Sequence, residues 1–87
     1  MSVVAQPTPN PNAMKFTADS LIFKGDGSVS VAAGQTSEYD IMNDLMKVDG
    51  VDNVFGFQNF ITINKKMDAE WDAVTPEVEK VFEEHGY

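Results

Sequence analysis

The chain has 87 residues, enough for one domain with a modest core but too few to enclose a deep substrate cavity. Fourteen acidic residues against six lysines give a net charge of −8, which repels the phosphate backbone of nucleic acids. The chain contains no cysteine, so it offers no disulfide, no thiol nucleophile and no thiolate ligand for a metal centre.

No apolar run approaches the roughly 20 residues that span a bilayer, so we expect a soluble single domain over residues 1–87 with no membrane partner. The first residues carry no positive cluster and no long apolar segment of the kind found in signal or transit peptides. The expected location is cytoplasmic, or mitochondrial or plastid if the chain is excised from a eukaryotic precursor.

The N-terminal stretch predicts a short strand at Ser2–Gln6 followed by a stiff loop. Three prolines alternate with Thr and Asn in this loop, and Asn side chains can bond neighbouring backbone groups. Two interpretations remain open for it. It is a strand connection, or a partner contact made by Asn10, Pro11 and Asn12.

Two further strands are predicted next. Ala13–Ala18 alternates, with Met14 and Phe16 on one face and polar residues on the other. Ser28–Ala32 alternates again, after glycine-rich turn residues and an extended Leu21–Phe23 segment.

A helix is then expected to begin at Ser37, with Asp40 three residues on in a pattern like a capping box. Apolar residues recur at i, i+4 and i+7 from Ile41 to Val48, and Gly50 provides a left-handed stop.

The stretch Val51–Lys65 predicts a β-hairpin with a two-residue turn at Gln58-Asn59, where the Asn tolerates a positive φ. Pairing across this turn sets Phe57 opposite Phe60, Phe55 opposite Thr62, and Asn53 opposite Asn64. One face then carries the aliphatic core residues Val54, Gly56, Ile61 and Ile63. The other face carries Phe55, Phe57 and Phe60.

A second helix is expected after an N-cap at Asp68, with Trp71 in the core. The apolar spacing continues through Pro76, which favours one kinked helix, although Thr75-Pro76 as a new helix start is the alternative. The acidic residues Glu79, Glu83 and Glu84 form a solvated face, or a negative surface for a basic protein patch or loosely held hard cations. His85 receives no functional role.

This order, β-β-β-α-β-β-α, predicts an α+β fold with a mostly antiparallel sheet and two helices packed on one face. The three phenylalanines Phe55, Phe57 and Phe60 would then lie uncovered on the open sheet face. Aromatic residues on an open sheet stack nucleic-acid bases in some proteins, but the net negative charge argues against that use here. No Ser/His/Asp set, phosphate-binding loop or embedded carboxylate pair is present, so we expect no enzyme.

The string Thr8–Phe16, TPNPNAMKF, resembles the opening signature of the N-terminal domain of Nfu/NifU-like iron–sulphur scaffold proteins. The resemblance continues through Gly50-Val51, Phe60–Ile63 and Trp71, in the order that this domain has them, and covers nearly the whole chain. In that family a CxxC pair in a separate C-terminal domain holds the cluster, and this chain has no cysteine.

The resemblance therefore implies an accessory protein-interaction role in iron–sulphur cluster assembly or delivery. The implied partners are carrier or client proteins, or a CxxC-containing domain of the same or another chain. No cofactor is expected to be retained, and oxygen ligands with one His would support at most a weak, exchangeable iron contact. The alternatives are a nucleic-acid-binding sheet and a homodimer that pairs the open faces, although we expect a monomer.

Overall fold

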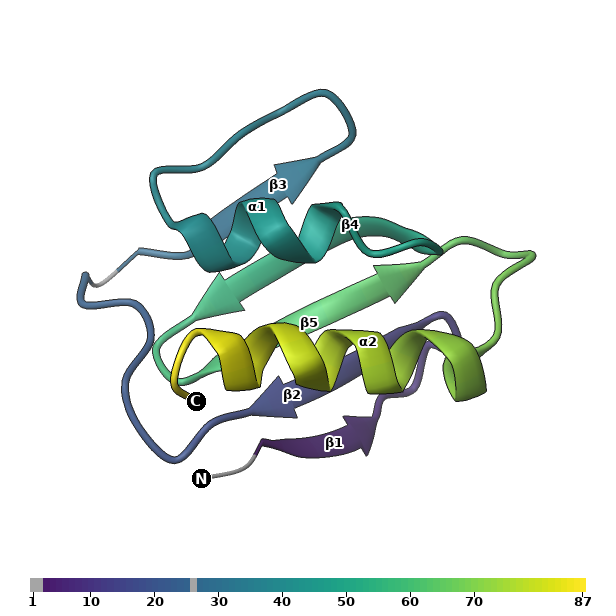
Figure 1. Cartoon of the computed structure of the whole chain (residues 1–87), viewed down its shortest axis with the longest axis horizontal. Coiled ribbons are helices and arrows are strands. Elements are labelled where there is room, and N and C mark those ends of the chain that lie inside the picture. Colours follow the sequence, from purple (N-terminus) through teal and green to yellow (C-terminus); the bar gives the residue numbers. More distant parts are fainter. Residues whose placement is uncertain (1–2, 26) are drawn as a thin grey trace.

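The computed structural model describes residues 3–25 and 27–87. Its elements follow the predicted order β-β-β-α-β-β-α, which confirms the α+β fold (Figure 1). The strands are β1 (Val4–Pro7), β2 (Ala13–Thr17), β3 (Val29–Ala32), β4 (Val51–Phe57) and β5 (Phe60–Lys65), and the helices are α1 (Asp40–Met46) and α2 (Trp71–Glu84).

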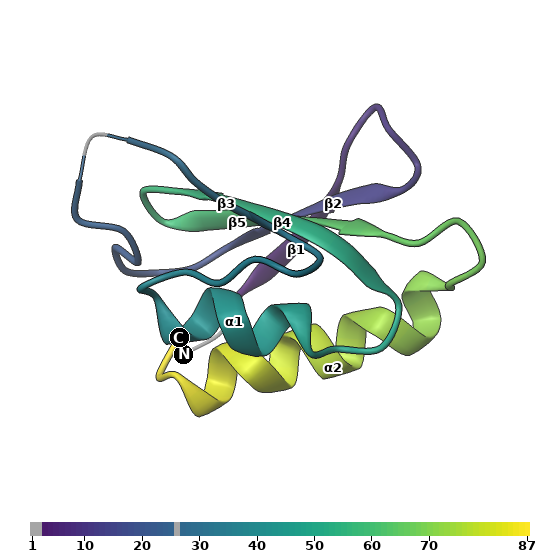
Figure 2. The same cartoon turned by 90° about the horizontal axis from the view of Figure 1, so that it is seen from above.

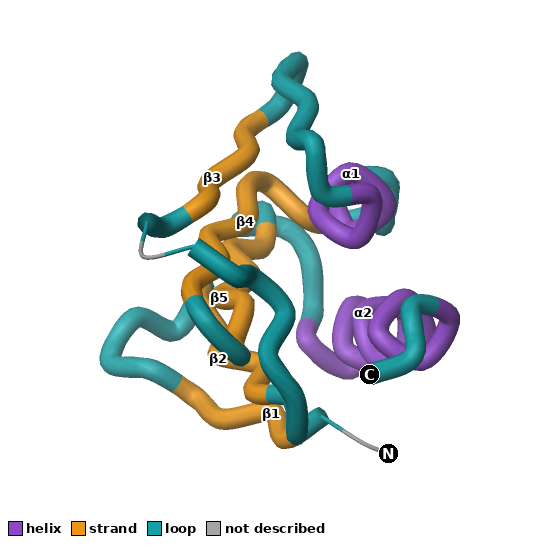
Figure 3. Tube along the Cα trace, turned by 90° about the vertical axis from the view of Figure 1, so that its left-hand side faces the viewer, coloured by secondary structure: helices purple, strands orange, loops and turns teal. Residues whose placement is uncertain are grey.

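The five strands form one antiparallel sheet in the order β1-β2-β5-β4-β3. Both helices lie on the same side of this sheet, so the domain has two layers and one open sheet face (Figures 2 and 3). No helix within the described ranges is long and apolar enough to cross a membrane.

The strand boundaries differ from the predicted ones by one or two residues. The first strand runs from Val4 to Pro7, later than predicted, and Ser2 lies outside the described residues. The segment Leu21–Phe23 is not part of the sheet. Instead, Ile22 and Phe23 are buried in the core, and their N–H groups both donate to the carbonyl of Gln58, at 2.9 Å each.

The predicted hairpin register is confirmed, with Phe57 opposite Phe60 at its tip. Gly56 is buried on the helix side of β4, directly beneath the ring of Phe23. A Cβ built on Gly56 would lie 2.3 Å from two ring carbons of Phe23, so any larger residue would displace the ring. Gly56 therefore allows Phe23 to close the core above the hairpin.

The first helix starts at Asp40, three residues later than predicted, and no side chain caps it. The hydroxyl of Ser37 does accept an N–H, but from Tyr39, at 3.1 Å. The side chain of Asn43 holds the backbone of Ser37 with two hydrogen bonds of 2.8 Å, one to its N–H and one to its carbonyl. These contacts fix Ser37 in a turn before the helix and replace the predicted capping box.

Gly50 has the predicted positive φ, at 95°, but it lies beyond the end of the helix. The last helical residue is Met46, and the intervening residues form a turn. A Cβ on Gly50 would meet the side chain of Val74 at 2.9 Å, so this glycine also permits α2 to approach the loop closely.

The second helix also begins later than predicted, after an N-cap at Glu70 that makes no side-chain bond. Asp68 lies instead in a turn closed by the bond from the N–H of Ala69 to the carbonyl of Lys66, at 3.0 Å. The helix runs without interruption through Pro76, which confirms the prediction of a single helix, and the alternative of a new start at Thr75-Pro76 is wrong.

The core lies between the sheet and the two helices. It includes the predicted aliphatic face of the hairpin, since Val54, Ile61 and Ile63 are at most 1% exposed. Phe16 and Phe82 stack across the layer boundary with ring centroids 6.0 Å apart. Trp71 packs against the edge of this core and is only partly buried, so the prediction that it is a core residue is confirmed only in part.

Candidate protein-docking surface

The open side of the sheet carries three phenylalanines in contact with one another. We call Phe55, Phe57 and Phe60 the aromatic face. The Phe60 ring lies between the other two, with its centroid 6.4 Å from that of Phe55 and 6.2 Å from that of Phe57. Phe55 is 39% exposed, and the others are half-buried. Both helices pack on the opposite side of the sheet (Figure 2), so neither helix covers this face.

The residues in line with the aromatic face are polar, apart from the exposed Val4 on the edge strand β1. The strand register places one row of side chains across the whole open sheet, consisting of Gln6, Lys15, Thr62, Phe55 and Ser30. The next row consists of Val4, Thr17, Phe60 and Phe57. The exposure of Phe55 follows from its neighbour Ser30 on the edge strand β3, which is too small to shield a ring.

A lysine sits on the aromatic face. The Nζ of Lys15 lies 4.3 Å from the centroid of the Phe60 ring, within cation–π distance. The sequence placed Lys15 away from the core, but it gave no sign that β2 would pair with β5 and bring the lysine to this ring. The five strands contain a single acidic residue, Asp52, so the acidic charge of the chain lies on its helices and loops.

The tip of the hairpin is held firmly. The positive φ of the turn falls on Gln58, at 53°, and not on the predicted Asn59. A non-glycine residue in this conformation costs about 1 kcal/mol. Asn59 pins the turn instead, because its Nδ2 donates to the carbonyl of Ala18 at 3.2 Å and its carbonyl accepts the N–H of Ala18 at 2.7 Å. These two bonds anchor the hairpin turn to the residue that follows β2.

The loop between β1 and β2 holds the other predicted site residues, and its polar groups are used internally. The hydroxyl of Thr8 donates to the carbonyl of Asn10 at 2.9 Å, and the Oδ1 of Asn10 accepts the N–H of Asn12 at 2.9 Å. These bonds agree with the interpretation of the loop as a strand connection. That Asn10, Pro11 and Asn12 bind a partner stays a prediction.

Two long side chains tie this loop to the rest of the domain. The Nζ of Lys65 donates to the Oδ1 of Asn12 at 2.9 Å, and the indole Nε1 of Trp71 donates to the carbonyl of Pro11 at 3.0 Å. The sequence could not reveal these bonds, which join residues more than fifty positions apart.

The structure does not bring all the predicted site residues into one patch. The aromatic face lies toward the hairpin tip, and the loop with Asn10, Pro11 and Asn12 lies at the opposite end of the sheet (Figure 1). Strand β5 connects the two ends and spans about 17 Å, at about 3.4 Å per residue. The loop does rise on the open side of the sheet (Figure 2), so it borders the same surface.

The lone histidine links the two helices. The Nε2 of His85 lies 2.7 Å from the Oδ2 of Asp44, and this hydrogen bond lowers the pKa of the Asp44 carboxyl. No group of three or more His, Cys, Asp or Glu residues that could hold a metal ion occurs within residues 3–25 and 27–87. The acidic residues Glu79, Glu83 and Glu84 are exposed, as the sequence predicted.

Comparison with known proteins points to one family. The family described as "Scaffold protein Nfu/NifU N terminal" matches residues 3–87. A NifU-like protein of Schizosaccharomyces pombe is 37% identical over 83 residues, which cover 93% of this chain and 32% of the relative. Conserved virulence factor C of Staphylococcus aureus is 28% identical over 79 residues, covering 88% of this chain and 20% of the relative. The chain therefore spans about a fifth to a third of these relatives.

Solved structures agree with the fold. The crystal structure of protein SAV1430 from Staphylococcus aureus matches with a TM-score of 0.84 and 36% identity, covering 94% of this chain and 99% of that one. A NifU-like protein from Saccharomyces cerevisiae matches with a TM-score of 0.76 and 23% identity, over 94% of this chain and 75% of that one. At that identity the second match supports the fold alone.

Proposed function

The chain belongs to the Nfu/NifU N-terminal domain family, and from this premise we propose that it is an accessory protein-interaction module in iron–sulphur cluster assembly or delivery. The proposed partners are iron–sulphur carrier or client proteins, including a CxxC-containing domain of the same or another chain. The module does not itself hold the cluster, because its 87 residues contain no cysteine and thiolates are the usual cluster ligands.

The observation that carries this proposal is the uncovered aromatic face. Phenylalanine side chains are enriched at the centres of protein interfaces, where a few buried anchors supply most of the binding energy. The Phe60 ring already contacts those of Phe55 and Phe57, which reduces the side-chain entropy that these residues lose on binding. The surrounding Thr and Asn side chains match the polar rim of such an interface.

The lysine on this face favours a protein partner with an acidic or carbonyl-rich rim. The Nζ of Lys15 contacts the Phe60 ring through cation–π attraction, and an ammonium group has three N–H donors with which to meet a carboxylate. A single lysine against a net charge of −8 is too little to hold a nucleic acid, so base stacking on the rings is not proposed. Any iron contact is weak and plays no part in the docking.

The test is an NMR titration of the labelled domain with a CxxC-containing Nfu-type domain and, separately, with carrier proteins. We expect amide shifts on β4 and β5 around Phe55, Phe57 and Phe60, and loss of these shifts in a Phe55→Ser variant. The matched control is Met67→Ser, which removes another exposed apolar side chain, 88% exposed, and should leave the shifts unchanged. Shifts confined to the helices would overturn the proposal, and concentration-dependent shifts without a partner would indicate a homodimer instead.

A further inference from the structure

A second surface lies on the other side of the sheet, beside helix α2. Each helix is about 10 Å across and so covers about two strands, which are spaced about 4.8 Å apart. Helix α1 packs on β3 and β4, and α2 runs alongside β5 and β2 (Figure 1). Strand β1 lies at the edge of the sheet, beyond α2. Neither helix therefore packs directly on the side of β1 that faces the helical layer.

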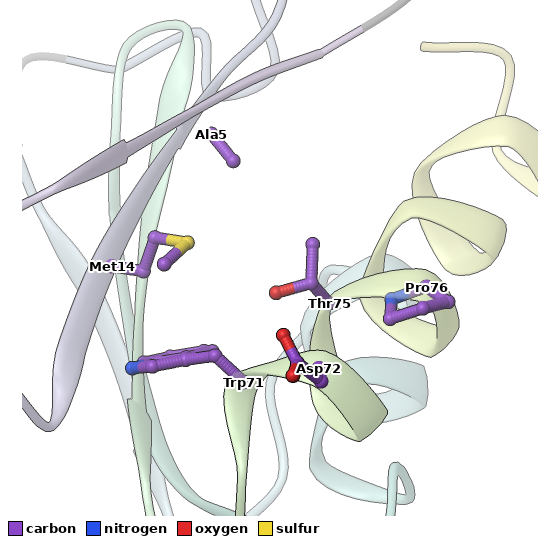
Figure 4. Close-up of a pocket in the computed structure, with 6 residues that line it drawn as sticks. All are labelled: Ala5, Met14, Trp71, Asp72, Thr75 and Pro76. Carbon is purple, nitrogen blue, oxygen red and sulfur yellow. The ribbon is translucent and has the colours of Figure 1, made fainter.

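A shallow groove of about 430 Å³ occupies this place. Ala5 and Met14 form its sheet side, and Trp71 closes one end (Figure 4). Asp72 and Thr75 reach toward it from α2, and Pro76 completes the lining. The groove is therefore mostly apolar, with one carboxylate at its margin.

Acidic residues continue from the groove along the same flank of α2, although Asp72 is the one that lines the groove itself. Positions i, i+3, i+7 and i+11 of a helix fall on one flank, and counted from Asp72 these are Thr75, Glu79 and Glu83. All three acidic residues on this flank are exposed, and the only lysine of α2, Lys80, falls on a different side. Strand β1, which forms the opposite wall, carries no charge that could neutralise them.

We propose that this groove binds a basic amphipathic segment of a partner protein, with an apolar side chain over Ala5 and Met14 and lysine or arginine residues against the acidic flank of α2. Charge complementarity selects this occupant, because a second copy of this chain would bring acidic residues against acidic residues. The site is separate from the aromatic face, on the other side of the sheet. It gives the domain two docking surfaces with opposite charge preferences.

The probe for this site is a short peptide with one leucine flanked on both sides by lysines. We expect it to shift the amide signals of Ala5, Met14 and Thr75 in the intact domain, and to bind more weakly as salt rises. A peptide with glutamates in place of the lysines, and one with alanine in place of the leucine, should both fail to bind.

Two double variants with the same net charge separate local from long-range attraction. Asp72→Asn with Glu79→Gln neutralises the groove flank, and we expect about fivefold weaker binding of the lysine peptide. Glu77→Gln with Glu84→Gln neutralises two exposed residues on another side of the same helix and should leave the affinity nearly unchanged. All four changes are at exposed positions, so folding should survive them.

Equal binding to the two double variants would overturn the proposal, as would shifts on the aromatic face or no binding of the lysine peptide at low salt. The Phe55→Ser variant should bind this peptide like the unaltered domain. Failure of the groove and failure of the aromatic face can therefore be told apart.

Discussion

Replacing Gly56 with alanine should destabilise the domain by about 2 kcal/mol, a typical cost of overpacking a core. The new Cβ would lie 2.3 Å from two ring carbons of Phe23, more than 1 Å closer than an ordinary carbon–carbon contact of about 3.5 Å. The ring has little room to move, because it is 1% exposed and packs edge-on against Tyr39 with centroids 4.9 Å apart. The backbone of Phe23 is also fixed, through its bond to Gln58.

Urea and thermal unfolding followed by circular dichroism would measure this effect, and we expect the Tm to fall by about 10 °C. Gly27→Ala is the matched control, because a Cβ at Gly27 would meet no atom within 4 Å and both alanines restrict the unfolded chain equally. In a Phe23→Leu background, where the ring is absent, Gly56→Ala should lower the free energy of unfolding by less than it does in the unaltered domain. Equal stability of Gly56→Ala and Gly27→Ala would refute the packing of Phe23 over the hairpin.

Three further changes test separate contacts. The hydrogen bond from His85 lowers the pKa of Asp44, so the stability that it provides is present above about pH 4, the ordinary range of Asp, and is lost as pH falls through the lowered pKa. Asp44→Asn should thus lower the free energy of unfolding by about 0.5 kcal/mol at pH 6, and this loss should shrink as the pH falls below 4, by urea unfolding at each pH. Gly50→Ala should lower the free energy of unfolding by about 2 kcal/mol more than Gly34→Ala does in the same assay. Both glycines have a positive φ, but only at Gly50 would the new Cβ meet other side chains. Trp71→Phe removes the hydrogen bond from the indole to the carbonyl of Pro11. It should therefore lower the free energy of unfolding by about 1 kcal/mol and speed amide hydrogen exchange in the β1–β2 loop.

Each of these has a clear contrary result. A pH-independent cost of Asp44→Asn would mean that the inter-helix pair does not act through its charge. Equal costs at Gly50 and Gly34 would show that backbone strain alone, and not the neighbouring side chains, limits the loop. Unchanged exchange in the loop of the Trp71→Phe variant would mean that other bonds, such as that of Lys65, suffice to hold it.

The hairpin was predictable because its pattern allows one register. Its two arms alternate around a two-residue turn, and a shift by one residue would move Ile61 and Ile63 out of the core. The same alternation assigned the aromatic residues to the other face. The neighbouring strands could not be ordered this way, so the pairing of β2 with β5, and hence the contact of Lys15 with Phe60, came only from the structure.

The helix starts were mispredicted for a common physical reason. Ser37 and Asp68 are residue types that cap helices, but each lies in a turn before the helix, fixed by other bonds. The backbone of Ser37 is bonded by the side chain of Asn43, six positions further along the chain. The capping-box pattern relates only residues three positions apart, so it could not predict this contact. Gly50 kept its predicted backbone conformation because that depends on local sterics alone.

The groove beside α2 had no signal in the sequence. Its lining joins Ala5 of the first strand with Trp71 of the last helix, and only the folded topology brings these residues together. The sequence predicted an acidic face of Glu79, Glu83 and Glu84, either solvated or attracting a basic protein, but only Glu79 and Glu83 lie on the flank of α2 that begins at Asp72. The structure adds that Asp72, on this flank, lies at the margin of an apolar groove.

The most direct test of the central claim, docking through the aromatic face, is the affinity of a CxxC-containing Nfu-type domain for the Phe55→Ser variant, measured by calorimetry. An anchor at the centre of an interface contributes about 2 kcal/mol or more, so we expect about 30-fold weaker binding than for the unaltered domain, with Met67→Ser unchanged. Equal affinities for Phe55→Ser, Met67→Ser and the unaltered domain would contradict the claim.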